Sequence, residues 1–456
     1  MSNSTVSELV VSQKIMSKPA PKTSCLMALT AAAAALPAFT APAYAAAPTE
    51  SFIGYRYSSY KESALEPEQV ASGSTDRYNI KVQQWNLAMP IKGQWLVAVS
   101  VQDETLTGAS PWYIKPADRP VVNSDGSPVL NANGEPTYVP DYTIPVAVMS
   151  GASPGYEDGN LVGIEEHRTD ASLASTYFYH GGSISGNVAF STEDDYESVS
   201  FGLSTEREFD QKQTVVAAGF SYSDDDIFYE DINRTNKRNT SDPLPDDAGK
   251  QNFSVFTSVS RIVSSNAVLL AGVSYAAKEG HMSDSYKLYD VRPEEKDSYT
   301  LNLAYRYYQK AIQAAWHLDY RFYDDTWGVQ SNTFSVALHK NWEKLQVVPS
   351  VRYYGQTAAS FYDIYSLHRK DGIPAEQNGG TDYSKWNYYS DDARLSEYGA
   401  FTFGMKLVYK QKPVDWVLGF EYYIADEEFL PGNSDYLAHP GMIEYTRVTF
   451  GVDHRF

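Results

Sequence analysis

Apolar and polar residues alternate along most of the chain, most clearly in its C-terminal half. In residues 298–309 every second residue is apolar or aromatic: Tyr299, Leu301, Leu303, Tyr305 and Tyr307. Residues 311–324, 399–410 and 414–424 follow the same period of two, and the apolar set of 311–324 includes Ile312. Side chains of a β-strand point alternately to the two faces of a sheet, so each segment predicts a strand with one apolar and one polar face.

The C-terminal segment has the same pattern. Counting back from Phe456, the alternate residues are His454, Val452, Phe450 and Val448. A closing strand that ends on an aromatic residue resembles the last strand of bacterial outer-membrane barrels. That resemblance implies that Phe456 is a signal read by the barrel-assembly machinery, which we therefore expect as a partner.

The alternation predicts about sixteen strands after residue 46. Their ranges are 51–60, 77–89, 94–105, 169–181, 183–192, 197–209, 213–225, 250–263, 266–279, 296–309, 311–324, 329–342, 345–357, 396–410, 414–425 and 443–456. Most are longer than the five or six residues typical of soluble sheets, and their polar faces carry too many charges for a sandwich core. The predicted fold is all-β, a transmembrane antiparallel barrel. Fourteen or eighteen strands are alternatives, because 51–60 and 183–192 are weak.

The connections between these strands alternate in length. Seven are short: 90–93, 181–182, 210–212, 264–265, residue 310, 343–344 and 411–413. The other set is mostly long: 61–76, 106–168, 226–249, 280–295, 358–395 and 426–442. An even strand number puts both chain ends on one side, so we predict short periplasmic turns and long extracellular loops.

Residues 1–45 resemble a cleaved secretory signal peptide. Lys14, Lys18 and Lys22 precede a short apolar run, and 43–45 form a small-x-small cleavage site. Met16 is an alternative start. The prediction gives two parts, a signal peptide over 1–45 and an outer-membrane barrel over 46–456, located in the outer membrane of a Gram-negative bacterium.

Composition excludes several function classes. Cys25 is the single cysteine and lies within the signal segment, so disulfides, thiolate catalysis and cysteine-ligated metals are excluded from the mature chain. The net charge is −20, which argues against nucleic acid as a partner. Tyrosine is abundant, with 36 residues, as the interfacial girdles of a membrane barrel require.

Five groups of residues resemble an uncharacterised family of Gram-negative outer-membrane β-barrel proteins, known only as a domain of unknown function. They are Gly108-Ala109-Ser110-Pro111, Ser283-Asp284-x-Tyr286-Lys287 with Asp290-x-Arg292-Pro293, Tyr305-Arg306-Tyr307-Tyr308, Asp324-Asp325-x-Trp327-Gly328, and Arg352-Tyr353-Tyr354 with Ser360-Phe361-Tyr362. The resemblance implies a barrel in the outer membrane and supplies no catalytic residue.

The polar faces of the strands near the C-terminus predict the lining of the lumen. The candidates are Arg306, Asp319, Arg321, Arg352, Lys406, Glu421 and Arg447. Cations outnumber acids in this set, which favours a weak anion preference; a network of ion pairs that fills the barrel is the alternative. Barrels of about sixteen strands are usually too wide for side chains alone to fill.

Other chemistry is weakly supported. The acidic loops either bind divalent cations that bridge lipopolysaccharide or form a solvated rim, and no calcium-loop spacing occurs, so no metal is assigned. His317 and Asp319 share a face, but no nucleophile–base pair indicates an enzyme. Thr107–Pro111 and Ser150–Pro154 nearly repeat and frame either an insert or two ordinary turns.

The sequence therefore predicts a passive, porin-like channel for small solutes, with no enzyme activity and no cofactor. Outer-membrane lipid and lipopolysaccharide are the expected surroundings, and a homo-oligomer is possible. The alternative is a non-conducting barrel that acts as a scaffold for surface or periplasmic proteins. Whether loop 106–168 lies inside the barrel or projects from it distinguishes these two hypotheses, since a wide-open lumen would argue against the scaffold.

Overall fold

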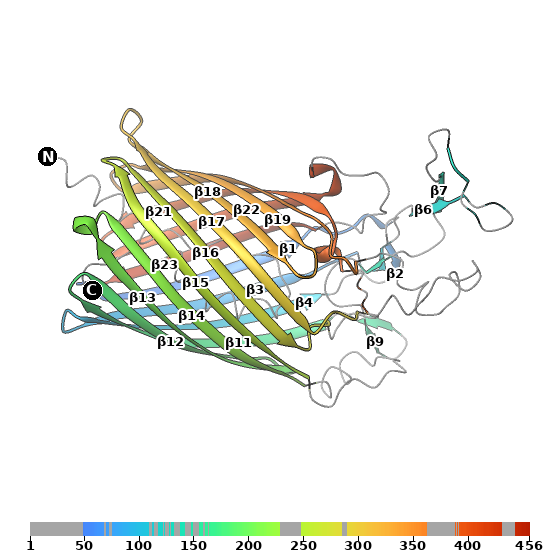
Figure 1. The fold of residues 1–456 in the computed structure, drawn as a ribbon, viewed down its shortest axis with the longest axis horizontal. Coiled ribbons are helices and arrows are strands. Elements are labelled where there is room, and N and C mark those ends of the chain that lie inside the picture. Colours follow the sequence, from blue (N-terminus) through green and yellow to red (C-terminus); the bar gives the residue numbers. More distant parts are fainter. Residues whose placement is uncertain are drawn as a thin grey trace.

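A closed antiparallel barrel forms the body of the computed structural model (Figure 1). The structure describes residues 49–456, apart from 229–247, 285–289, 431–442 and parts of 68–74, 109–163 and 363–391. The predicted signal peptide, and most of the near-repeat at 107–111 and 150–154, lie outside the described residues. Among those described, no helix has the length and apolar character needed to cross a membrane.

Sixteen strands make up the barrel, each hydrogen-bonded to its two neighbours. They are β1 (Phe52–Glu62), β3 (Asn79–Ile91), β4 (Trp95–Gly108), β11 (Ile164–Tyr179), β12 (Gly182–Thr192), β13 (Tyr196–Phe209), β14 (Thr214–Ile227), β15 (Ala248–Ser264), β16 (Ala267–Gly280), β17 (Glu295–Gln309), β18 (Ala314–Asp325), β19 (Gln330–Asn341), β20 (Leu345–Gln356), β21 (Tyr398–Gln411), β22 (Val414–Asp426) and β23 (Glu444–Arg455). This confirms the predicted fold class and the count of sixteen.

Most strand boundaries differ from the prediction by one to five residues, and two of these differences are informative. Residues 311–313, expected in a strand, form the turn before β18, because Gln313 has a φ of 49° and its amide donates to the Lys310 carbonyl. A left-handed residue cannot continue an extended strand. At the start of β11, the structure begins the strand at Ile164, where the sequence predicted residue 169.

Short strands in the long connections were not predicted. They are β2 (Val70–Ser72), β5 (Trp112–Tyr113), β6 (Ala117–Pro120), β7 (Tyr138–Asp141), β8 (Ala147–Val148), β9 (Gly155–Glu157) and β10 (Asn160–Val162). Strands β2, β5 and β8 make one small sheet, while β6 pairs with β7 and β9 with β10. In Figure 1, β6 and β7 lie beyond the right-hand end of the barrel.

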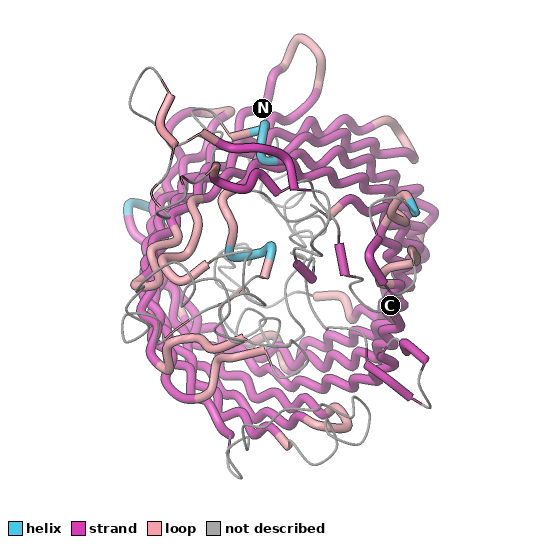
Figure 2. The backbone as a smooth tube through the Cα atoms, turned by 90° about the vertical axis from the view of Figure 1, so that its right-hand side faces the viewer, coloured by secondary structure: helices cyan, strands magenta, loops and turns pink. Residues whose placement is uncertain are grey.

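The barrel has two unlike ends. The turns β3–β4, β13–β14 and β21–β22 lie at the end that also carries the C-terminus, which we call the turn end. The long connections gather at the opposite end, which we call the loop end (Figure 1). Figure 2 faces the loop end and shows the strands as a ring. The predicted alternation of connection lengths is therefore present, with two short exceptions at the loop end, 193–195 and 326–329.

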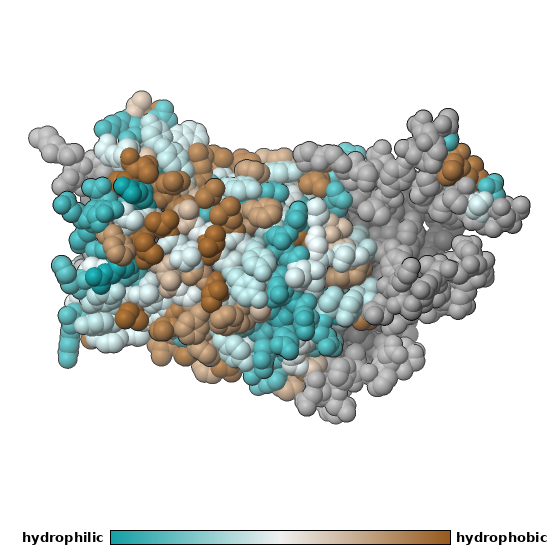
Figure 3. Space-filling view, viewed as in Figure 1, coloured by the Kyte–Doolittle hydropathy of each residue, from teal (hydrophilic) through white to brown (hydrophobic). Residues whose placement is uncertain are grey.

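Alternation along the strands places apolar side chains on one face of the barrel wall. Large apolar residues are exposed at every second position along the C-terminal strands, for example Leu303, Leu318, Phe334, Val351, Phe403, Leu418 and Phe450. Figure 3 shows apolar residues across the middle of the barrel wall and polar residues toward both its turn end and its loop end. Membrane barrels need both features of this arrangement. Closure of the sheet satisfies the backbone hydrogen-bonding groups within the sheet, and the apolar outer face suits contact with lipid.

Candidate functional site on the inner wall

All seven predicted lining residues lie on the strand face opposite the exposed apolar residues. Arg306 of β17 adjoins exposed Tyr305, and Asp319 and Arg321 of β18 follow exposed Leu318. The same alternation places Arg352, Lys406, Glu421 and Arg447 on the inward face of β20, β21, β22 and β23. The inner wall is therefore charged where the outer wall is apolar.

Four of the seven residues form two ion pairs between neighbouring strands. Arg306 Nη2 lies 2.6 Å from Asp319 Oδ1, and Arg447 Nη2 lies 2.7 Å from Glu421 Oε2. Register accounts for both contacts, because Glu421 stands directly opposite Arg447, and Asp319 is two residues from His317, which stands opposite Arg306. These arginines contribute little net positive charge to the wall.

Across the part of the chain that the structure describes, the other three lining residues are cations that form no ion pair with a neighbouring carboxylate. Among the described residues, none of Arg321, Arg352 and Lys406 forms an ion pair with a carboxylate within 4.0 Å. Arg321 and Arg352 are close enough to repel each other electrostatically. Asp319, two residues from Arg321 on β18, is engaged by Arg306, and Asp325, four residues after Arg321, binds Lys296 at 2.9 Å and accepts from the amides of Trp327 and Val329. Among these seven residues, the unpaired positive charge thus lies at Arg321, Arg352 and Lys406.

Sequence reasoning did not select an inward group of tyrosines at the loop end of the same strands. Tyr423 of β22 stacks on Tyr445 of β23 with centroids 4.8 Å apart, and Tyr445 packs on Tyr60 of β1 at 4.5 Å. The ring centroids of Tyr354 of β20 and Tyr398 of β21 lie 5.7 Å apart. The sequence did contain a signal for this group, because these tyrosines occupy strand positions that the alternation assigns to the polar, inward face.

The phenol groups of this band donate to acceptors of the wall itself. Tyr445 donates to Glu421 Oε1 at 2.8 Å, and Tyr60 donates to Glu62 Oε1 at 2.8 Å. Tyr354 donates to Gln356 Oε1 at 2.5 Å, and Tyr323 donates to Asp325 Oδ2 at 2.7 Å. These bonds fix the ring orientations and use the hydroxyl protons of these four tyrosines within the wall.

Two further ion pairs on the inner wall were also missed. Arg56 of β1 pairs with Asp453 of β23, with Nη1 to Oδ1 at 2.5 Å and Nη2 to Oδ2 at 2.6 Å. Arg455 Nη1 lies 2.8 Å from Asp415 Oδ2. Each acid is almost fully buried at 2% exposure. The first pair joins the strands that close the barrel, which no local sequence pattern reveals.

The histidine considered for catalysis is held in a different contact. His317 stacks on His339 of the next strand with ring centroids 3.8 Å apart, while Asp319 is engaged by Arg306. Within the described part of the chain, His317 and Asp319 share the wall but not a hydrogen bond.

Two loops meet at the loop end through a network of acids and arginines. Arg292 donates from Nη2 to Asp392 Oδ2 at 2.9 Å, and Arg394 Nη2 lies 3.1 Å from Asp284 Oδ2. Arg292 Nε lies 2.8 Å from Asp290 Oδ2. An apolar cluster beside it comprises Trp327, Val329, Ala359, Phe361 and Leu395. The described parts of connections 281–294 and 357–397 are therefore joined to each other and to the β18–β19 connection.

A group of carboxylates at the loop end lies beside an arginine. The oxygens of Glu166, Glu193 and Asp195 fall within 4.8 Å of one another, the one such group among the residues described. Arg168 Nη1 lies 3.5 Å from Glu193 Oε1 and already supplies a positive charge. Burial, opposed by Arg168, raises the pKa of Glu193 to about 8. We assign no metal here.

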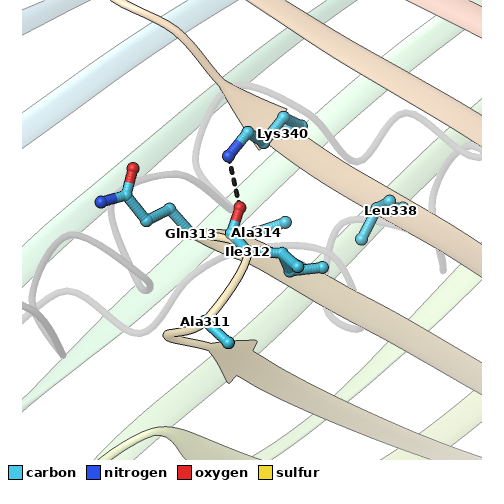
Figure 4. Close-up of a pocket in the computed structure, with 6 residues that line it drawn as sticks. All are labelled: Ala311, Ile312, Gln313, Ala314, Leu338 and Lys340. Carbon is cyan, nitrogen blue, oxygen red and sulfur yellow. Dashed lines mark hydrogen bonds between the residues drawn. The ribbon is translucent and has the colours of Figure 1, made fainter.

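A hollow at the turn end has a different character (Figure 4). It is lined by Ala311, Ile312, Gln313, Ala314, Leu338 and Lys340. Lys340 Nζ donates to the Ile312 carbonyl, which ties β19 to the β17–β18 turn. The Lys340 ammonium is thus used to hold the turn, and few other polar groups converge on the hollow, so it adds nothing to the candidate site.

Comparison with known proteins identifies the family. The family described as Protein of unknown function (DUF3570) matches residues 26–443, and the chain belongs to this family. This confirms the resemblance to an uncharacterised family of barrel proteins. No curated protein matches the chain.

Solved structures with similar architecture are outer-membrane proteins. A structure described as a bacterial polysaccharide outer membrane secretin has 9% identity and a TM-score of 0.42, covering 89% of this chain and 98% of its own. OpdK from Pseudomonas aeruginosa has 9% identity and a TM-score of 0.38, covering 89% and 99%. A BenF-like porin from Pseudomonas fluorescens Pf-5 has 8% identity and a TM-score of 0.39, covering 89% and 98%. Values this low carry no argument about function.

Proposed function

We propose that the chain is a passive channel for small solutes in the outer membrane of a Gram-negative bacterium. The observation that carries this proposal is a closed sixteen-stranded wall that is apolar outside and charged inside. Barrels of sixteen to eighteen strands enclose an aqueous channel, whereas smaller ones are filled by their own side chains. Arg321, Arg352 and Lys406 give the inner wall a positive bias, from which we propose a weak anion preference.

Planar bilayers test this function directly. The folded full chain, reconstituted at low protein density, should produce stepwise current increases. Absence of conductance over a wide voltage range, with protein shown to be folded in the same preparation, would count against the channel.

A scaffold function is the second candidate, and the β6–β7 hairpin favours it. These strands lie beyond the barrel end in Figure 1, where a protein partner can reach them. Deleting residues 117–141 separates the two functions. A channel should keep its conductance after the deletion, whereas a scaffold should lose a partner captured by cross-linking at this hairpin.

Several associations belong to the same proposal. Outer-membrane lipid and lipopolysaccharide would contact the apolar wall, and the barrel-assembly machinery would read Phe456, whose side chain is 63% exposed. We propose no enzymatic role, since His317 and Asp319 are engaged by His339 and Arg306.

A further inference from the structure

One region of the inner wall combines unpaired cations with aromatic rings. It comprises Arg321 of β18, Arg352 and Tyr354 of β20, Tyr398 of β21 and Tyr423 of β22, which we call the tyrosine–arginine patch. All five side chains are half-buried. They are therefore held by the wall while part of each remains accessible.

The two arginines differ from the other arginines of this wall. Arg56, Arg306, Arg447 and Arg455 each bind a carboxylate on a neighbouring strand. Within the described residues, Arg321 and Arg352 have no such acid, although one strand alone, β19, separates them. Neighbouring strands lie about 4.8 Å apart, so two guanidinium groups on β18 and β20 can reach one bound anion. An anion between them would relieve their mutual repulsion.

Register places small residues between the large ones. Thr333 and Ala400 stand directly opposite Tyr354, and Thr402 stands between Arg352 and Tyr423. Small side chains therefore flank Tyr354 on both neighbouring strands, which leaves room beside its ring, whereas Tyr423 is stacked on Tyr445.

The chemistry of the tyrosines selects the type of solute. The Tyr354 hydroxyl donates to Gln356 Oε1, so its proton is not available to the hydroxyls of a neutral sugar. Ring surface remains, and it favours a flat apolar group. The guanidinium fork matches a carboxylate, with which it forms paired, charge-assisted hydrogen bonds.

We infer that the tyrosine–arginine patch binds small aromatic carboxylates, with the carboxylate between Arg321 and Arg352 and the ring against the tyrosines. This inference rests on the proposed channel function and adds its solute class. The patch would act as a positioning surface on the path of the solute, with no covalent step.

Benzoate is a suitable probe for the patch. Calorimetric titration of the folded full chain in detergent should give saturable binding, with acetate and benzyl alcohol each binding more weakly because one lacks the ring and the other the charge. Equal binding of acetate and benzoate, or of benzyl alcohol and benzoate, would overturn the assignment.

Substitutions locate the site. Arg321→Gln and Arg352→Gln should each weaken benzoate binding about tenfold or more. Arg352→Lys keeps the positive charge and a side chain of similar length, but should still weaken binding because lysine lacks the planar guanidinium group that can bind a carboxylate at two points. Arg261→Gln, an exposed arginine at the turn end, is the matched control and should bind as the unmodified chain does. Unchanged binding in all three patch variants would overturn the inference.

Conductance measured on the same preparations separates the two proposals. Stepwise conductance without benzoate binding would preserve the channel and overturn the patch. Benzoate binding that depends on Arg321 and Arg352, without conductance, would preserve the patch and overturn the channel.

Discussion

Arg56 and Asp453 form a two-point ion pair across the seam between the first and last strands of the barrel. The distances are 2.5 Å and 2.6 Å, and Asp453 is 2% exposed. The Arg56 guanidinium also donates to the Tyr55 and Val452 carbonyls. The pair thus links the backbones of β1 and β23 as well as their side chains.

We expect Asp453→Asn to destabilise the barrel. Removing one partner of a buried pair leaves the other charge uncompensated, at a cost of about 3–5 kcal/mol. Asp319→Asn is the control, because Asp319 is 43% exposed and its pair should contribute about 0–1 kcal/mol. Urea titrations followed by tryptophan fluorescence measure both, and equal midpoints for the two variants would contradict the expectation.

Ion selectivity should depend on the unpaired arginines. In a salt gradient, replacing both Arg321 and Arg352 with Gln should shift the reversal potential toward cations, because charge in a confined lumen is weakly screened. Replacing Arg306 with Gln together with Asp319 with Asn removes one charge of each sign and should produce a smaller shift. A larger shift from the second double variant would show that the paired residues set the preference.

The loop network should fail locally when its central acid is lost. Asp392 is fully buried and accepts hydrogen bonds from Arg292 and from the Arg394 backbone amide. Asp392→Asn should therefore speed amide hydrogen exchange in connections 281–294 and 389–397 while the barrel strands stay protected. Glu428→Gln, at an exposed position of the same end, is the comparison and should leave exchange as it was.

The pH dependence of stability should include a contribution from Glu193. Its pKa is about 8 in the folded chain, against an ordinary value of 4.5, because of burial. Between these values the folded state holds a proton that the unfolded state releases, so this contribution to stability falls as pH rises toward 8.

Melting temperatures at pH 5 and pH 9 test that contribution. Glu193→Gln should reduce the loss of stability between the two values, whereas Asp194→Asn, at the neighbouring exposed position, should not. The same loss in both variants would mean that other groups set the dependence.

The alternation of residues was sufficient to predict the wall but not its contacts. A period of two fixes which face Arg306 and Asp319 occupy, whereas the stagger between strands decides that Tyr423 meets Tyr445 and that Arg352 stands opposite Ser335. Stagger depends on turn geometry and barrel closure, which the sequence does not display locally.

The turn before β18 illustrates the same limit. Ile312 continues the apolar alternation, and the segment lacks glycine and proline, yet Gln313 adopts a left-handed conformation and ends the turn. In a similar way, the small sheet of β2, β5 and β8 joins segments from two loops, and no periodic signal marks strands of two or three residues.

Closure of the ring has a consequence for the order of events in folding. The hydrogen bond between Arg56 and Asp453 joins positions 397 residues apart, so this contact has nearly the greatest sequence separation that the described chain allows. Contacts of such high order are slow, because the intervening chain must be organised first. Until β23 arrives, β1 presents unpaired amides and carbonyls along one edge, as does β23 itself, and such edges invite pairing with other chains. The barrel can therefore be completed only after synthesis of the whole chain, and its nascent edges need protection throughout that interval.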